Sequence, residues 1–489
     1  MHLWVRMVEA RKRHGAKIVT IDPFRSVTAA RSDWHLAPRP GTDAALALGL
    51  MHVIFHDGLA DEDYLRDHCL GSDELRDRVL SDYAPKRVAE TTGLEVAEIE
   101  QLARRLGLRP DQPVIVGTES QPTGPASVIR INYGLQRHAG GGMAVRTIAC
   151  LPAVIGAWRH PAGGILLSTS GTFAFNLAAV QRPDLIPPGT RTINMTQLAE
   201  ALHGELPGPP VQALYVYNSN PAAIAPDQQR VLAGLRRDDL FTVVHDQFPT
   251  DTVDYADIVL PATTQLEHFD LHGSYGHQFV QVNVPAIAPL GESRCNTEVF
   301  RGLARRLGFE PELFEVSDEQ LARELLWETE PPENVPAAMR GITLERLKRE
   351  GAIKLNGIEP PNVTASRNEA AKLTAPFANG GFATPSGKCE LRCERLVALG
   401  HDPLPTFIPP AESPASAPEL AKRFPLQLLS PPSPHFLNST FVEVDSLRRS
   451  AVEPQLEISA ADANARAIQH GDFVNVFNIA IAIRPRRLG

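Results

Sequence analysis

Apolar residues along part of this chain change between the spacing of strands and the spacing of helices. Two short β-rich runs, Ala213–Tyr217 and Leu240–His245, are separated by a helical pattern over Asp227–Leu235, and a third run follows at Ala256–Leu260. This order predicts parallel pairing, because parallel strands need a crossover connection between them. The pattern therefore indicates an α/β fold with a doubly wound parallel sheet.

Polar, turn-forming residues follow each of these three predicted strands. They read Asn-Ser-Asn-Pro from Asn218 to Pro221, His-Asp-Gln from His245 to Gln247, and Pro-Ala-Thr-Thr after Leu260. Ligands of such sheets bind beyond the carboxyl ends of the strands, and amide, hydroxyl and carboxylate groups there suit a nucleotide-like ligand. Ordinary turn chemistry explains the Asn-Ser-Asn-Pro sequence as well.

The N-terminal part shows a similar mixture of elements. The spacing predicts a helix over Leu3–Arg13 that ends at Gly15, and then a strand over Lys17–Ile21. Asp22 follows this strand, where a carboxylate could bind a ribose or a base, or could simply form an Asx turn. A helix feeding a parallel strand should itself follow a strand, so we expect that a natural N-terminal part is missing.

A second candidate anion site precedes the predicted helix Ala44–His56. The residues before it read Arg-Pro-Gly-Thr-Asp from Arg39 to Asp43, and Gly58 follows its end. Thr42 or Asp43 is expected to cap this helix. The N-terminus of a helix also attracts anions, and Gly41 would allow a close approach of the backbone.

Further helices are expected over Asp61–His68 and Glu95–Gly107, with a short buried strand at Val114–Gly117. A glycine-rich stretch, Tyr133–Gly142, then leads into a helix that runs through Ile155. Its Arg137 and His138 form a natural pair to face an anionic substrate or a pterin, although a plain surface loop explains them equally well.

The C-terminal third is predicted to contain a helix at Glu298–Leu307, capped by Asn296 or Thr297. Asp402–Pro434 is rich in proline and reads as an extended linker. A strand is expected at Phe424–Leu429, where a new domain begins, followed by a short helix that starts at Asp462 and a strand at Phe473–Phe477.

Composition narrows the class of protein. The chain has 489 residues, with a formal net charge of −9, which disfavours a nucleic-acid partner. Its longest apolar run, Ala44–Phe55, is far shorter than the roughly 20 residues of a membrane span, and the N-terminus has no signal-peptide apolar region. The five cysteines form no CxxC pair, so none has iron–sulfur or zinc spacing, and a reducing, cytoplasmic location fits.

The polar segments together resemble the molybdopterin oxidoreductase family, the dimethyl sulfoxide reductase superfamily. The resemblance rests on Asn-Ser-Asn-Pro, on Asp-Gln-Phe with Thr252, on Ala-Asp-Ile-Val-Leu-Pro-Ala, on Ile-Asp-Pro, on Arg-Pro-Gly-Thr-Asp-Ala-Ala, and on the segment Phe382–Leu391. It implies an α/β core over residues 1–308, a helix and loop region with a linker over 309–423, and a C-terminal β-barrel domain over 424–489. The barrel is expected to be incomplete, because the last residues do not match the family.

The resemblance implies a molybdenum or tungsten atom held between two molybdopterin guanine dinucleotides. The residues it assigns to cofactor binding are Asp22, Gly41, Thr42, Asp43, Asn218, Asn220, Pro221, Asp246, Gln247, Thr252, Asp257, His435, Asn438 and Ser439. It leaves Arg137 and His138 as candidate catalytic residues. It also implies a small-molecule substrate, of the formate or nitrate type, and an electron-transfer protein as partner.

Two family features are absent from this sequence. There is no N-terminal cysteine motif for an iron–sulfur cluster, and the segment that carries the protein ligand of the metal is expected to lie before Met1. We therefore assign no metal ligand in this chain, and we do not favour a zinc site at Glu267, His268 and His272.

Two alternatives remain at this stage. One is a non-catalytic scaffold of the same fold inside an electron-transfer complex. The other is a nicotinamide dehydrogenase, which would need a glycine-rich fingerprint after the first strand. Asp22-Pro23-Phe24-Arg25 stands there instead.

Overall fold

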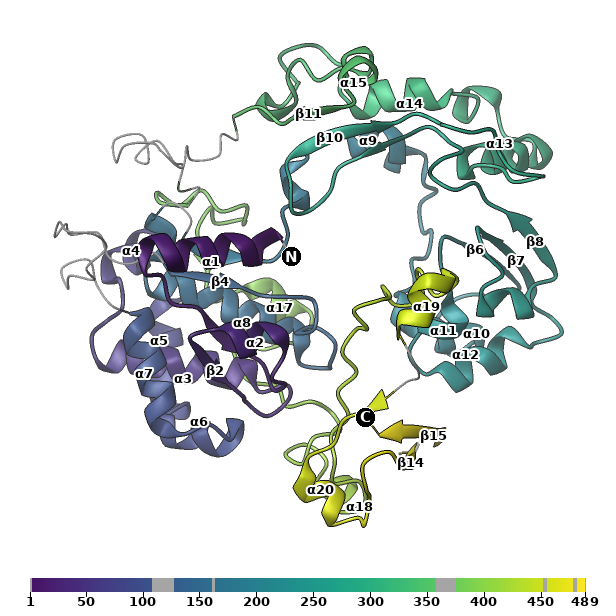
Figure 1. Ribbon diagram of the computed structural model, residues 1–489. Coiled ribbons are helices and arrows are strands. Elements are labelled where there is room, and N and C mark those ends of the chain that lie inside the picture. Colours follow the sequence, from purple (N-terminus) through teal and green to yellow (C-terminus); the bar gives the residue numbers. More distant parts are fainter. Residues whose placement is uncertain are drawn as a thin grey trace. The chain divides into compact units, whose positions relative to one another are not determined.

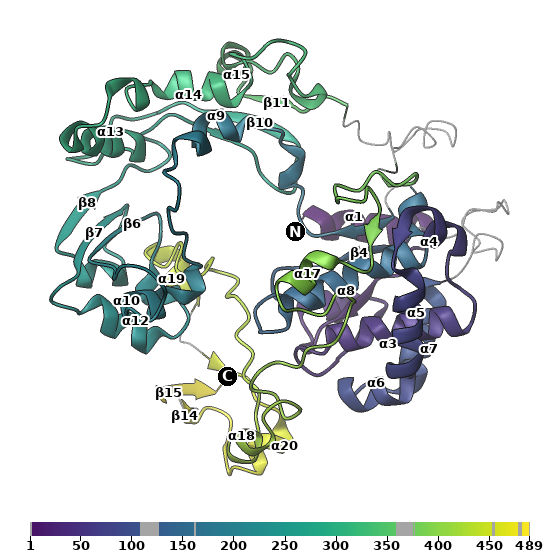
Figure 2. The same ribbon diagram turned by 180° about the vertical axis from the view of Figure 1, so that it is seen from behind.

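The structure is a computed structural model that describes residues 2–107, 127–160, 163–357, 375, 377–451, 455–477 and 482–488. The expected strand at Val114–Gly117 lies outside these residues. The chain forms two compact units (Figures 1 and 2). Unit 1 contains Met1–Thr169, Tyr275–His277 and Glu359–Leu429, and unit 2 contains Ser170–Ser274, Gln278–Ile358 and Ser430–Gly489. No helix among the described residues is long and apolar enough to cross a membrane.

Unit 1 is mostly helical, with three small parallel sheets. Its helices are α1 (His2–His14), α2 (Val27–Arg31), α3 (Asp43–His56), α4 (Glu62–His68), α5 (Ser72–Asp82), α6 (Pro85–Thr92), α7 (Val96–Leu106), α8 (Gly141–Val154), α17 (Glu394–Ala398) and α18 (Pro418–Arg423). Its parallel strand pairs are β1 (Val19–Ile21) with β2 (Trp34–Leu36), β4 (Val128–Arg130) with β5 (Gly164–Leu166), and β3 (Cys69–Leu70) with β12 (Cys389–Glu390).

The core of unit 1 is built around α3. Its sequence is apolar on every side, which is typical of a buried helix, and α5, α6, α7 and α8 all pack against it (Figure 1). Gly49 lets α6 approach closely, since a Cβ atom there would lie 2.9 Å from both Cγ atoms of Val88. The two 14-residue helices α3 and α8 also pack directly against each other.

Unit 2 contains the predicted parallel sheet. Strands β6 (Ala213–Tyr217), β7 (Phe241–Asp246) and β8 (Ile258–Pro261) pair in the order β6-β7-β8, all parallel, which confirms the strand, helix, strand prediction. The crossover contains α11 (Pro221–Ile224) and α12 (Gln228–Leu235), and α10 (Leu198–Leu202) packs against α12. Leu202, Val231 and Leu235 are among the buried residues of this part of the core.

The remainder of unit 2 has a second core and a small C-terminal sheet. The antiparallel sheet β11-β10-β9 comprises Ala352–Lys354, Phe279–Asn283 and Asp270–His272. The helices of unit 2 outside the β6–β8 region are α9 (Leu177–Gln181), α13 (Asn296–Leu307), α14 (Asp318–Leu325), α15 (Leu344–Glu350), α19 (Asp445–Ala451) and α20 (Ala460–Asn464).

The C-terminal sheet has the order β13-β15-β14, with β13 (Gln455–Leu456), β14 (Phe473–Phe477) and β15 (Ala482–Leu488). The predicted strand Phe473–Phe477 is therefore confirmed. The sheet is open, and no closed barrel is found among the described residues, so the β-barrel of the family is not seen here. The three sequence ranges expected as domains stay a prediction.

Four local expectations need correction. Phe424–Leu429 forms no strand, and Asp462 lies inside α20, which Ser459 caps through its hydroxyl. The N-cap of α13 is Cys295 and not Asn296 or Thr297. The proline-rich stretch is not a simple linker, because Leu404 is buried in the core of unit 1 and Phe407 packs against that core.

Candidate functional site

In unit 1 the candidate residues gather where β1 ends and where α3 and α8 begin. Asp22 follows β1, Asp43 is the first residue of α3, and His138 lies two residues before Gly140, the N-cap of α8. The charge of Asp43 is influenced by both Asp22 and His138, which places the three side chains near one another. We call Asp22, Gly41, Thr42, Asp43 and His138 the Asp43 site.

Burial controls the protonation of Asp43. Loss of hydration raises the pKa of its carboxyl above the usual value, because a buried carboxylate is poorly solvated. His138 opposes this rise, and the neighbouring Asp22 adds to it. The site therefore favours a carboxyl group that retains its proton to higher pH than an exposed aspartate would.

His138 lacks hydrogen-bond partners. Its Nδ1 and Nε2 atoms are both buried, and neither has a partner among the described residues. A buried polar group without a partner costs about 1–3 kcal/mol. A ligand with hydrogen-bonding groups would remove this cost, so the donor and acceptor pattern of the site fits a polar cofactor such as a pterin or a nucleotide.

The backbone at both helix N-termini is tightly enclosed. Gly41 has a φ of +73°, and a Cβ atom on it would clash with the ring of Pro410. A Cβ atom on Gly140 would clash with the carbonyl oxygen of Ile408. The segment from Ile408 to Pro410 thus contacts both turns, and the sequence pattern gave no sign of this because the segment reads as linker.

Two helix N-termini are therefore close together in this site. The first N–H groups of each helix have no partner within the helix, and the helix dipole favours negative charge there. Such a pair of termini suits an anionic group, such as a pyrophosphate.

The details of the turn before α3 differ from the prediction. Thr42 is the N-cap residue, but its hydroxyl donates to the carbonyl oxygen of Arg39 at 2.7 Å and does not cap the helix. The Asp22 carboxylate accepts a hydrogen bond from the Phe24 N–H at 2.9 Å. This is the Asx turn that the sequence offered as an alternative to a ribose or base contact. Arg137 is exposed on a turn, so it differs from the half-buried His138 beside it.

In unit 2 a second group of candidates lies at the carboxyl edge of the β6-β7-β8 sheet. Asn218 follows β6 with a φ of +51° and is exposed. Asp246 ends β7, and its carboxylate accepts a hydrogen bond from the Gln247 N–H at 2.7 Å. The Gln247 side chain donates to the carbonyl oxygen of Thr263, just after β8, at 3.0 Å. This edge therefore presents amide and carboxylate groups from the ends of β6 and β7.

Asn220 and Thr252 hold this edge together from inside. Asn220 donates to Asp251 at 3.0 Å, and its carbonyl oxygen accepts from the Thr252 hydroxyl at 2.8 Å and from the Thr252 N–H at 3.2 Å. The Thr252 hydroxyl also accepts from the N–H of Ala222, next to Pro221, at 3.2 Å. Both side chains are buried, so their role is to fix the conformation of the loops. Exposed residues of the same loops, such as Asn218, are the ones that a ligand could contact.

Asp257 lies elsewhere. It precedes β8 and accepts a hydrogen bond from the Thr242 N–H at 2.7 Å, near the start of β7. Because the strands are parallel, this is the amino edge of the sheet, opposite to Asn218 and Asp246. The structure does not bring Asp257 together with the other candidates.

Glu267 and His268 are engaged by the protein itself. The Glu267 carboxylate accepts from the Thr264 N–H at 2.7 Å and from the Leu290 N–H at 2.6 Å, and these bonds lower its pKa. His268 Nδ1 is hydrogen-bonded to the Thr263 hydroxyl at 2.9 Å. No three His, Cys, Asp or Glu side chains are placed to hold a metal ion in the part of the chain that the structure describes.

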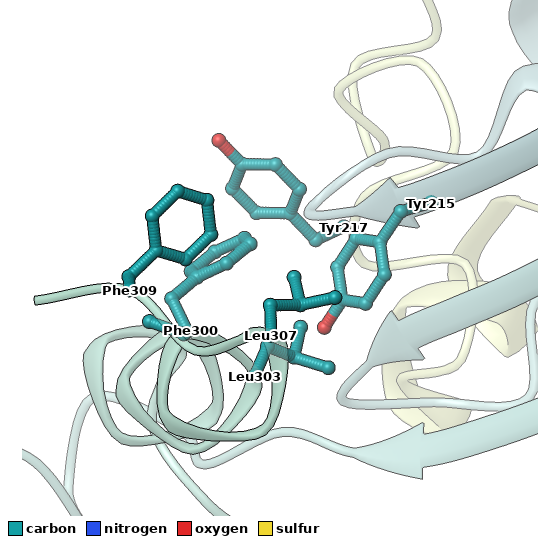
Figure 3. Close-up of a pocket in the computed structure, with 7 residues that line it drawn as sticks. Tyr215, Tyr217, Phe300, Leu303, Leu307 and Phe309 are labelled. Atoms are coloured by element: carbon teal, nitrogen blue, oxygen red, sulfur yellow. The ribbon is translucent and has the colours of Figure 1, made fainter. Parts of the chain in front are cut away.

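An apolar groove of about 480 Å³ lies beside β6, between the strand and α13 (Figure 3). Tyr215 and Tyr217 alternate with Leu214 and Val216, so the two tyrosines share one face of the sheet. The ring of Phe300 on α13 lies 5.1 Å from that of Tyr217, centroid to centroid. The groove contains very few polar groups, and it is an apolar neighbour of the edge that carries Asn218.

The last three candidates lie in one turn of unit 2. Leu437 and Thr440 form an isolated bridge, so Asn438 and Ser439 are the corner residues, and Asn438 has a φ of +56°. The N–H of His435 donates to the Ser433 hydroxyl at 3.2 Å. Asn438 is exposed, and His435 and Ser439 are half-buried.

Comparison with known proteins decides the family. A sequence model described as molybdopterin oxidoreductase matches residues 3–306, which is more than half of the chain. The chain belongs to the molybdopterin oxidoreductase family.

Relatives in this family cover nearly the whole chain. The probable oxidoreductase YoaE of Bacillus subtilis is 39% identical over 98% of this chain. The dimethyl sulfoxide reductase DmsA of Escherichia coli is 29% identical over 96% of it. The solved structure of acetylene hydratase from Pelobacter acetylenicus matches 97% of the chain with a TM-score of 0.71 and 26% identity.

This chain spans less than two thirds of the length of each of these relatives. It spans 63% of YoaE, 60% of DmsA and 64% of the acetylene hydratase chain. The family and the mixed α/β fold with parallel sheets are thus established, and a molybdenum or tungsten molybdopterin cofactor is what the family implies.

Proposed function

We propose that this chain is the cofactor-binding part of a molybdenum- or tungsten-dependent oxidoreductase that carries out two-electron chemistry on a small molecule. The observation that carries the proposal is His138, whose two buried nitrogen atoms lack protein partners beside the two helix N-termini of the Asp43 site. When bound, the cofactor supplies the redox chemistry, and the protein supplies binding, orientation and electrostatics.

Within this proposal the cofactor is a bis-(molybdopterin guanine dinucleotide), and groups suited to bind parts of such a cofactor are present in each unit. The N-termini of α3 and α8 would bind a pyrophosphate, and the Asp43 carboxyl would donate to a base or pterin. At the carboxyl edge of the unit 2 sheet, the exposed Asn218 and Gln247 and the half-buried Asp246 would bind a nucleotide portion. His435, Asn438 and Ser439 would contact a pterin.

We propose a small-molecule substrate and assign it no narrower chemical class. The relatives named above include a dimethyl sulfoxide reductase and an acetylene hydratase, and their names give no support to the formate or nitrate type. We also propose an electron-transfer protein as partner, because a two-electron reaction on the substrate must be balanced by a second redox partner.

The proposal is tested by replacing His138 with leucine, which removes both nitrogen atoms and keeps a similar volume. We expect pterin retention by the purified chain to fall by about tenfold or more, because a lost hydrogen bond to a buried ligand costs about 1–3 kcal/mol. The melting temperature of the cofactor-free protein should stay equal or rise, since no hydrogen bond of the His138 ring to the described part of the protein is lost. The measurements are pterin fluorescence and thermal unfolding.

The control is His203→Leu. His203 is exposed in unit 2, and its ring Nε2 is hydrogen-bonded to the carbonyl oxygen of Arg230 at 2.9 Å, so this variant should keep its pterin. Unchanged pterin in the His138 variant would refute the assignment of the Asp43 site. Absence of pterin from all three proteins would favour the non-catalytic scaffold instead.

A further inference from the structure

Two cysteines that are far apart in the sequence lie directly opposite each other in unit 1. Cys69 in β3 and Cys389 in β12 are register partners in a two-residue parallel ladder. The two thiols interact, and this contact is the largest cause of a raised pKa at Cys389. Cys69 is buried, whereas Cys389 is half-buried and gives a small reagent a route to the pair.

The surrounding contacts keep the two strands in this register. The N–H of Arg392 donates to the carbonyl oxygen of Leu70 at 3.1 Å, and a Cβ atom on Gly71 would clash with the backbone and Cβ of Arg392. Arg146 of α8 donates to the carbonyl oxygens of Leu391 and Pro403, both at 2.9 Å. The chain that directly follows Cys389 is therefore held in place beside β3.

Register partners in paired strands lie at a separation that a disulfide can bridge. Neighbouring strands lie about 4.8 Å apart, and disulfide-bonded residues have Cα atoms about 4.4–6.8 Å apart. Side chains of register partners also point to the same face of their sheet. We propose that Cys69 and Cys389 are an oxidation site that closes to a reversible disulfide.

The reaction balances with hydrogen peroxide as the oxidant. One thiolate sulfur attacks a peroxide oxygen, the O–O bond breaks, and hydroxide leaves to become water while a sulfenic acid forms. The second thiol sulfur attacks this sulfur, the S–O bond breaks, and a second water leaves as the S–S bond forms. The two sulfur atoms lose two electrons in total, and the peroxide is reduced to two waters.

The environment makes this site slow to react at neutral pH. The raised pKa of Cys389 keeps its thiol protonated, and only the thiolate is a good nucleophile. Oxidation should therefore accelerate as the pH rises toward the alkaline range. Once formed, the bond would link two segments that are separated by most of the chain. A disulfide that closes a long loop lowers the conformational entropy of the unfolded state most, and so it stabilises the folded state most.

The test treats the native full chain with hydrogen peroxide, blocks the remaining thiols by alkylation, and maps cross-linked peptides by mass spectrometry. We expect a Cys69–Cys389 cross-link that a dithiol reductant removes, and a melting temperature higher by about 5 °C or more in the oxidised protein. The shift should be absent in Cys389→Ser and retained in Cys393→Ser, whose cysteine is four residues away and also half-buried.

The cross-link map needs no variant, so a folding defect in Cys389→Ser would not obscure the result. The proposal would be overturned by a link between other cysteines, by oxidation of Cys69 or Cys389 to sulfinic acid without a link, or by a link that forms only in denaturant.

Discussion

Asn220 is held by three hydrogen bonds, while Asn218, two residues earlier in the same motif, is exposed with a positive φ. The two asparagines therefore have different tasks at the carboxyl edge of unit 2. The sequence could predict that polar groups follow each strand, because turn chemistry and strand spacing are local. It could not distinguish the roles of the two asparagines, because Asn220 bonds Thr252, which lies 32 residues later in the chain. The pairing of β6 with β7 brings these two residues together.

Asn220→Ala should destabilise unit 2 by about 2–3 kcal/mol, because it leaves the N–H and hydroxyl of Thr252 buried without their acceptor. Asn218→Gly is the matched control and should change stability by less than about 0.5 kcal/mol, since glycine accepts a positive φ. Urea unfolding followed by circular dichroism measures both. Equal effects of the two substitutions would contradict the division of tasks.

Elements with strong local signals were the most predictable part of this fold. The bounds of α3, α7 and β6 agree with the sequence pattern to within a residue or two, and the parallel order of β6, β7 and β8 follows from the crossover rule. Caps were less predictable: the Thr42 hydroxyl donates to the carbonyl oxygen of Arg39, and Cys295 is the N-cap of α13. A cap depends on side-chain orientation, which the residue type alone does not determine.

Gly41→Ala tests the turn that begins α3. Alanine at a φ of +73° costs about 1–2 kcal/mol, and the clash with Pro410 should bring the total to about 2–4 kcal/mol. Gly58→Ala, at a φ of +66° with open space around it, should cost only about 1–2 kcal/mol. Thermal and urea unfolding of both variants give the comparison. A Gly41 variant no less stable than the Gly58 variant would show that Pro410 does not confine this turn.

At the scale of the whole chain, the two units are each assembled from separate stretches of sequence. Ile408 and Pro410 close over the turns at Gly140 and Gly41, and Cys389 pairs with Cys69. These contacts join residues hundreds of positions apart, so no pattern within a window of sequence could reveal them. The family could nevertheless be inferred from the sequence, because its motifs are short and lie at strand ends and helix starts.

The measurement that tests the central claim most directly is a cofactor inventory of the purified, folded chain produced with molybdate or tungstate. Mass spectrometry would quantify the metal, fluorescence the pterin, and acid hydrolysis the released guanosine monophosphate. The account predicts molybdenum or tungsten together with two pterins and two guanosine monophosphates for each metal atom. A folded chain that carries neither metal nor pterin would contradict it, and the Asp43 site would then be a structural feature of a non-catalytic scaffold.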